Sequence, residues 1–152
     1  MPLNRAWIEA HIPHQGRMCL LEEVIDWDQR RIRCRSTTHR APDNPLRSHG
    51  RLGAACGIEY AAQAMALHGA LANDAAAGSE AAKPRAGLLA SVRDVRLWVS
   101  RLDDTEGDLI CEAHRLAGDR NSALYEFALR AAGRDLLSGR AAVVLNAGIK
   151  QA

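Results

Sequence analysis

Residues 53–73 read GAACGIEYAAQAMALHGALAN, a run of mostly small and apolar residues in which Glu59 is the single charged side chain. A helix of this composition has no polar face to turn toward water, so the run predicts a long helix, about residues 54–73, that is buried on most sides. A lone carboxylate in such surroundings is costly unless it has a task or a partner. Buried carboxyl groups with a raised pKa are natural general acids, and Glu59 is therefore the first candidate for a functional residue.

Length and composition indicate one globular domain over residues 1–152, large enough to bury a core of its own. The net charge is only +2, and the basic residues alternate with acidic ones, so no nucleic-acid partner is expected. The cysteines are far apart and have no paired spacing, which argues against a metal site and against a disulfide framework. They are Cys19, Cys34, Cys56 and Cys111.

Two sequence features concern the cellular location of the protein. Residues 1–16 lack the continuous apolar stretch of a secretion signal, so a cytoplasmic protein is expected. The run of residues 53–73 is long enough to cross a bilayer, but Glu59, Gln63 and His68 interrupt it and its small residues give it low hydrophobicity. No membrane span is expected.

The segments around the helix have the patterns of strands. Residues 18–27 and 31–38 predict two strands joined by a tight turn, and the second alternates Ile32, Cys34 and Ser36 with arginines that face water. Loops are predicted at residues 41–52 and 73–85. Four further strands are predicted at residues 88–99, with a bulge near Asp94, and at residues 109–116, 124–131 and 136–145. This order predicts an α+β fold in which an antiparallel sheet wraps one central helix.

Two motifs give the chain a family resemblance. Residues 12–18 read IPHQGRM and are followed by Leu20, Leu21 and Val24, and residues 57–65 read GIEYAAQAM. Together with the strand pattern, they resemble the hot-dog-fold β-hydroxyacyl thioester dehydratases, nearest the smaller subgroup found in aryl-polyene biosynthesis clusters. The resemblance implies a hot-dog fold, a homodimer with both helices inside one continuous sheet, and active sites at the dimer interface. It also implies an acyl-carrier-protein or coenzyme A thioester as substrate and no cofactor.

The resemblance also implies site residues. In the larger dehydratase family, a loop histidine ahead of the helix acts with the helix carboxylate, commonly that of the partner subunit. The carboxylate matches Glu59, and the nearest loop histidine is His49. The sequence after His49 lacks the family's histidine, aromatic, proline, glycine motif, so His14 is a rival base.

The proposed chemistry explains why these residue types are needed. Elimination of water from a 3-hydroxyacyl thioester takes a proton from C2 and gives one to the departing hydroxyl group, which a histidine and a carboxylic acid can do. A backbone N–H of Cys56 or Gly57, near the helix start, is expected to stabilise the thioester oxygen. Gln63 lies one helical turn after Glu59, where it orients that carboxylate, binds substrate or makes a structural hydrogen bond.

Alternative interpretations stay open. Glu59 can form a structural ion pair with an arginine such as Arg51, and Cys56 can be a small buried side chain in place of a nucleophile. A hot-dog thioesterase can use a helix carboxylate alone to activate water or attack the thioester. A third possibility is a non-catalytic hot-dog subunit that binds acyl thioesters or supports an active second subunit in a mixed complex.

Overall fold

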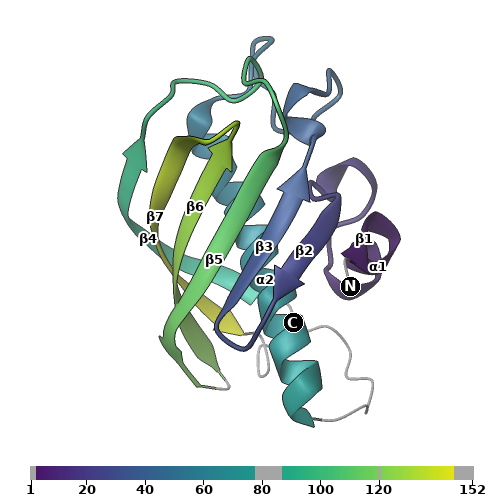
Figure 1. The fold of residues 1–152 in the computed structure, drawn as a ribbon, viewed down its shortest axis with the longest axis vertical. Coiled ribbons are helices and arrows are strands. Elements are labelled where there is room, and N and C mark those ends of the chain that lie inside the picture. Colours follow the sequence, from purple (N-terminus) through teal and green to yellow (C-terminus); the bar gives the residue numbers. More distant parts are fainter. Residues whose placement is uncertain (1–2, 78–86, 120, 146–152) are drawn as a thin grey trace, which may run out of the picture.

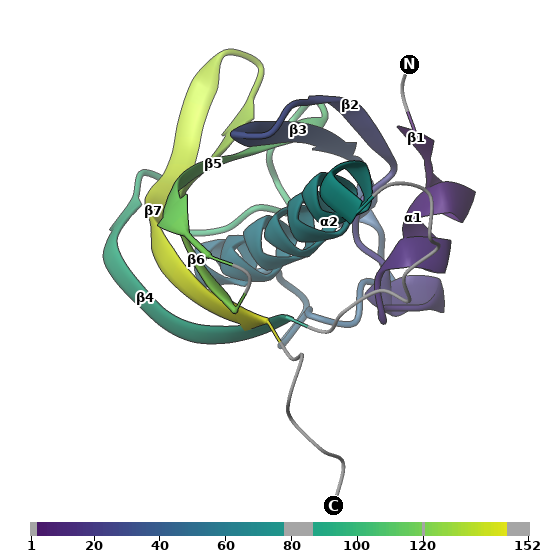
Figure 2. The same ribbon diagram turned by 90° about the horizontal axis from the view of Figure 1, so that it is seen from below.

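The computed structural model describes residues 3–77, 87–119 and 121–145. One curved antiparallel sheet wraps a long helix, α2, which runs through the hollow of the sheet (Figures 1 and 2). This is the predicted α+β hot-dog arrangement. The strands are β1 (Leu3–Asn4), β2 (Glu23–Trp27), β3 (Arg31–Ser36), β4 (Gly87–Leu97), β5 (Leu109–Gly118), β6 (Ser122–Ala131) and β7 (Arg134–Leu145). The helices are α1 (Arg5–His11) and α2 (Gly57–Ala77), and short 3-10 turns lie at η1 (Gly16–Met18), η2 (Thr38–Arg40) and η3 (Ala54–Cys56).

The central helix is close to its predicted range. The first residues of the predicted helix form the 3-10 turn η3, and α2 then continues to Ala77, four residues past the predicted end. The extension is Ala-rich, and alanine has the highest intrinsic helix propensity. The predicted loop at residues 73–85 therefore begins as helix, and its residues 78–85 lie outside the described residues.

The sheet has the strand order β1-β2-β3-β5-β6-β7-β4, so β4 lies at one edge. In β3 the predicted alternation is confirmed, because Ile32, Cys34 and Ser36 are buried and the intervening arginines are partly exposed. The bulge predicted near Asp94 is also confirmed. Asp94 has a positive φ of 55°, and the register of β4 on β7 shifts between Arg93 and Arg96.

The start of β2 differs from the prediction. The strand begins at Glu23 instead of Met18 because Met18 and Leu20 bond to side chains, and backbone bonding to β3 starts only where the Glu22 N–H donates to the Arg35 carbonyl at 2.8 Å. Met18 ends the 3-10 turn η1, and the N–H and carbonyl groups of Leu20 bond to Gln63, Ser36 and Thr38. Residues 12–22 therefore form a loop that side chains hold in place.

The helix lies close against the sheet at its first residue. Gly57 is buried, and a Cβ atom there would overlap the side chain of Leu137 on β7 and lie 3.0 Å from that of Leu129 on β6. Close contact between helix and sheet thus favours glycine at this position. Neither described helix is long and apolar enough to cross a membrane.

Candidate active site

Glu59 lies in the first turn of α2 and is exposed in the single chain. The expectation of a buried carboxylate is therefore wrong for one subunit, because the sheet covers the opposite side of α2, where Tyr60, Ala64 and Leu67 are fully buried. Within the described residues, Glu59 forms no ion pair with Arg51 within 4.0 Å. The structural ion pair considered for Glu59 is thus not observed.

His14 lies in the loop between α1 and η1, and its ring is half-buried. Burial lowers the pKa of His14, and the nearby negative charge of Glu59 acts in the opposite direction. Nδ1 of His14 is enclosed and has no hydrogen-bond partner. The loop therefore brings a histidine that is neutral near pH 7 within electrostatic reach of the helix carboxylate.

Gln63 is only 1% exposed, and both ends of its side-chain amide are used. Oε1 accepts a hydrogen bond from the N–H of Leu20 at 2.9 Å, and Nε2 donates to the carbonyl of Met18 at 2.7 Å. Of the three roles left open for Gln63, the structure supports the structural hydrogen bond. The amide holds the loop that carries His14 against the same helical turns that carry Glu59.

The N–H groups of Cys56 and Gly57 are engaged in the 3-10 turn before α2. The Cys56 N–H donates to Gly53 at 3.0 Å, and the Gly57 N–H donates to Ala54. Neither is the free donor expected for a thioester oxygen, because the helix begins with a hydrogen-bonded 3-10 turn instead of open N–H groups. Burial also raises the pKa of the Cys56 thiol, so this side chain is not an activated nucleophile.

His49 is exposed at the tip of a tight turn. The backbone groups of Ser48 and Arg51 bond to each other, and His49 and Gly50 both have positive φ angles, 53° and 76°. Nδ1 of His49 lies 3.0 Å from the Ser48 hydroxyl oxygen. The single chain thus brings His14 under the electrostatic influence of its own Glu59, whereas the contacts of His49 lie within its own turn.

Two other histidines are buried. His68 is 0% exposed and lies in α2, where Nδ1 is 2.7 Å from the Tyr125 hydroxyl and Nε2 is 2.8 Å from the Asp28 carbonyl. His39 is also 0% exposed, and Nε2 is 3.1 Å from the carbonyl of Thr105. Neither the alanine-rich sequence around His68 nor the polar sequence around His39 indicates these partners.

A family model described as ApeP-like, ApeP dehydratase, matches residues 6–151. The chain belongs to the ApeP-like dehydratase family. The match confirms the resemblance to the dehydratases of the aryl-polyene pathway. A comparison with curated proteins gave no match.

Solved structures with the same fold include dehydratases and thioesterases. One, titled the dehydratase heterocomplex ApeI:P from Xenorhabdus doucetiae, superposes with a TM-score of 0.79 and 24% identity, covering 93% of this chain and 91% of that one. The thioesterase HI1161 from Haemophilus influenzae has a TM-score of 0.56 and 12% identity, with 81% and 76% covered. At these identities the two likenesses establish the hot-dog fold alone.

Proposed function

We propose that this protein eliminates water from 3-hydroxyacyl thioesters whose acyl group is carried by an acyl carrier protein. Membership of the ApeP-like dehydratase family supports the reaction class. The observation that supports the site is that Gln63 bonds the loop that carries His14 to α2, within reach of the Glu59 charge, which acts to raise the pKa of His14. The family resemblance supports the substrate class and the role of Glu59, and the bonded loop supports His14 as its base.

The proposed reaction needs one base and one acid. His14, which burial keeps neutral, takes a proton from C2 of the substrate, and the carboxylic acid of Glu59 gives a proton to the hydroxyl group leaving C3. The C2–H and C3–O bonds break, the C2–C3 double bond forms, and water departs. Transfer of the proton from His14 back to Glu59 through solvent restores the starting state.

A second subunit is part of this proposal, because Glu59 is exposed in the single chain. A second subunit and a bound substrate that together cover Glu59 would favour the neutral, proton-donating carboxyl group that the reaction requires, whereas without substrate the charge of Glu59 acts on His14. The edge strand β4 offers a surface for it, since Val95, Leu97 and the adjacent Trp98 are 39%, 50% and 51% exposed. We propose that the chain pairs along β4, as a homodimer or with a second hot-dog subunit.

The test is the reversible hydration of a 2-enoyl thioester by purified protein, followed as loss of the conjugated enoyl absorbance. We expect Glu59→Gln and His14→Ala each to lower the rate by about 10²- to 10⁴-fold with little change in melting temperature. Full activity in Glu59→Gln would overturn the proposed site. Activity lost in His49→Ala and kept in His14→Ala would assign the base to His49, acting on the carboxylate of the partner subunit.

Two further assays separate the alternatives. Release of free thiol from acyl thioesters would identify a thioesterase, because elimination leaves the thioester bond intact. The exposure of Glu59 also favours a subunit that is active only in a mixed complex, and the relative from Xenorhabdus doucetiae is named as a heterocomplex. Turnover that appears only after co-expression with a second hot-dog protein would support the mixed complex over the homodimer.

A further inference from the structure

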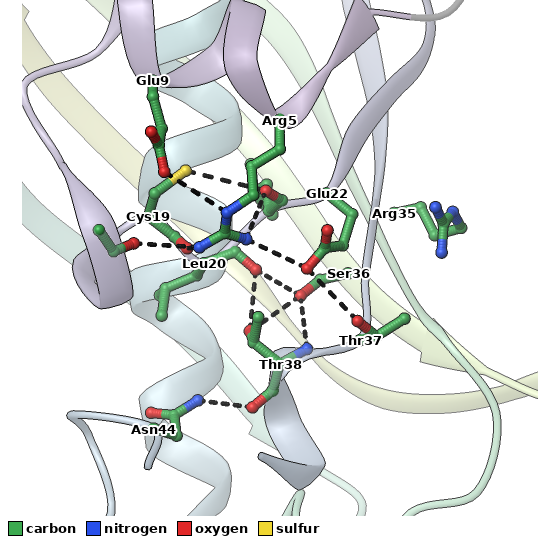
Figure 3. A network of polar contacts seen from close by, with 12 residues as sticks. Arg5, Glu9, Cys19, Leu20, Glu22, Arg35, Ser36, Thr37, Thr38 and Asn44 are labelled. Carbon is green, nitrogen blue, oxygen red and sulfur yellow. Dashed lines mark hydrogen bonds and ion pairs between the residues drawn. The ribbon is translucent and has the colours of Figure 1, made fainter.

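Arg5, in the first turn of α1, contacts several groups of the loop that follows His14 (Figure 3). Its Nη2 atom donates to the carbonyl of Cys19 at 2.6 Å and to that of Gly16 at 3.0 Å. Nη1 donates to Glu22 at 3.1 Å and, at 3.4 Å, to the carbonyl of Leu21. One guanidinium group thus gathers three backbone carbonyls that are separated along the chain.

The contacted carbonyls fix the turn next to His14. Gly16 begins the 3-10 turn η1, two residues after His14, and Cys19 follows its end. Gly16 has a positive φ of 59°, so the chain bends sharply there. The planar fork of an arginine holds these two carbonyls with Nη2 and Glu22 with Nη1 at once, whereas a lysine is a compact point charge and cannot reach both sets in the same geometry.

The opposite side of the same loop is held by other elements. Gln63 of α2 bonds to Met18 and Leu20, as described above. The Leu20 carbonyl also accepts hydrogen bonds from Ser36 at 2.5 Å and from Thr38 at 2.8 Å, the pair drawn below it in Figure 3. Arg5 therefore holds from the α1 side a loop that α2, β3 and η2 hold from the other side, and Gln15 of the loop also donates to the Glu9 carbonyl of α1 at 2.5 Å.

We propose that Arg5 is a positioning residue that fixes the His14 loop against α2, so that the His14 ring lies beside Glu59. Arg5 acts through His14 and touches no reacting atom in this arrangement. The catalytic importance of Arg5 rests on the proposed function, whereas its control of the distance between His14 and Glu59 can be measured without any substrate. A displacement of about 1 Å at such a site costs about 100-fold in rate.

The test uses the His14 ring as the reporter. In the wild-type protein, Glu59→Gln removes a charge that acts on His14, so the midpoint of the His14 titration, followed by NMR, should fall. With Arg5→Lys in the background, we expect Glu59→Gln to change this midpoint less or not at all. In the hydration assay, Arg5→Lys should lower kcat by about 10- to 100-fold with KM little changed.

The control is Arg130→Lys, which changes an arginine that pairs with Asp135 at 2.9 Å on exposed sheet residues and leaves the loop intact. It should leave the titration of His14 and kcat as in the wild type. A folded Arg5→Lys protein in which Glu59→Gln still shifts the His14 midpoint by the wild-type amount would overturn the proposal. If Arg5→Lys does not fold, Glu22→Lys, which places a positive charge against Nη1 of Arg5, should reduce the effect. An unchanged effect in folded Glu22→Lys protein would overturn the proposal.

The same data separate the two proposals. A protein without dehydratase activity whose His14 titration depends on Arg5 would refute the proposed reaction and support the positioning of His14. An active protein whose His14 titration is insensitive to Arg5 would support the reaction and refute the role of Arg5.

Discussion

At the scale of single residues, Gln63 joins the two halves of the candidate site. Its amide bonds α2 to the loop at Met18 and Leu20. Tyr60, one helical turn earlier, has its hydroxyl oxygen 2.9 Å from that of Thr38 in the same region. Asn44 donates to the Tyr60 hydroxyl at 2.9 Å. Burial raises the pKa of Tyr60 to about 12, so this hydroxyl stays protonated at physiological pH and remains able to donate a hydrogen bond.

We expect Gln63→Leu to lower the free energy of unfolding by about 1–3 kcal/mol, because it leaves the N–H of Leu20 and the carbonyl of Met18 without partners in a buried position. Urea denaturation measures the change. The same substitution at Gln29, which is exposed in the turn between β2 and β3, should change the stability by less than about 0.5 kcal/mol. Equal stability of Gln63→Leu and the wild type would show that the amide is not what holds the loop.

The sequence identified Glu59 and His14 as candidates because one is an isolated charge and the other lies in a motif. It did not reveal which of the two candidate histidines lies near the carboxylate. His14 is 45 positions before Glu59 in the sequence, whereas His49 is only ten positions before it. Long-range side-chain hydrogen bonds nevertheless hold the loop of His14 against the helix. Such bonds have no period or spacing in the sequence, and the same reason explains why Arg5 was not recognised.

At the scale of elements, the contact between α2 and the sheet depends on the absence of a side chain at Gly57. We expect Gly57→Ala to destabilise the protein by about 1–3 kcal/mol, because the added methyl group would overlap Leu137 and press on Leu129. Thermal unfolding monitored by circular dichroism measures the effect.

Gly53, four residues earlier, provides the matched control. It has a φ of −65°, and a Cβ atom there would meet no atom within 4 Å. Gly53→Ala should therefore be neutral or stabilise the protein by up to about 1 kcal/mol, since alanine restricts the unfolded chain. Equal losses at the two glycines would contradict a steric explanation for Gly57.

The elements themselves were largely predictable, because a buried helix and alternating strands leave a periodic pattern. The long helix, β3 and the four later strands were placed to within a few residues. Helix α1 was not predicted: it has seven residues and one buried side chain, Ile8, and its start depends on a cap that Asn4 gives to the N–H of Trp7 at 2.9 Å. A helix that short gains its stability from tertiary contacts rather than from its own pattern.

At the scale of the whole molecule, stability should depend on the protonation of buried histidines. Burial lowers the pKa of His14, His39 and His68 in the folded protein, whereas in the unfolded chain each returns to about 6.5. Below that pH the unfolded chain binds more protons than the folded one, so the free energy of unfolding should be constant above it and fall as the pH decreases.

Urea denaturation at about pH 7.5 and about pH 5.5 tests this dependence. The carboxylates with lowered pKa values stay ionised over this range, so the change in stability reports on the histidines. His68→Gln retains a donor for Asp28 and an acceptor for Tyr125, and it should flatten the pH profile. Stability that is equal at both pH values, or greater at the lower one, would contradict the expected sign.

Assembly is the second property at this scale. If the chain pairs along β4, Leu97→Lys should lower the molar mass measured by light scattering to that of one subunit, since a lysine on an edge strand opposes strand pairing. Leu116→Lys on β5 is the control, because Leu116 is 46% exposed and Leu97 is 50% exposed. Loss of assembly in both variants, or in neither, would remove β4 as the interface.

The opposite edge of the sheet limits what such pairing can build. There, β2 is paired with β1 over Leu3–Asn4, and the chain turns directly into α1 at the side of the barrel-like wall (Figure 2). A subunit whose sheet has two open edges can pair with a neighbour at each edge and so polymerise, whereas a subunit with one open edge can pair only once. If subunits pair along β4, the short N-terminal strand and helix at the opposite edge would act as a chain terminator, so that strand pairing would stop at two subunits and would not continue into a fibre.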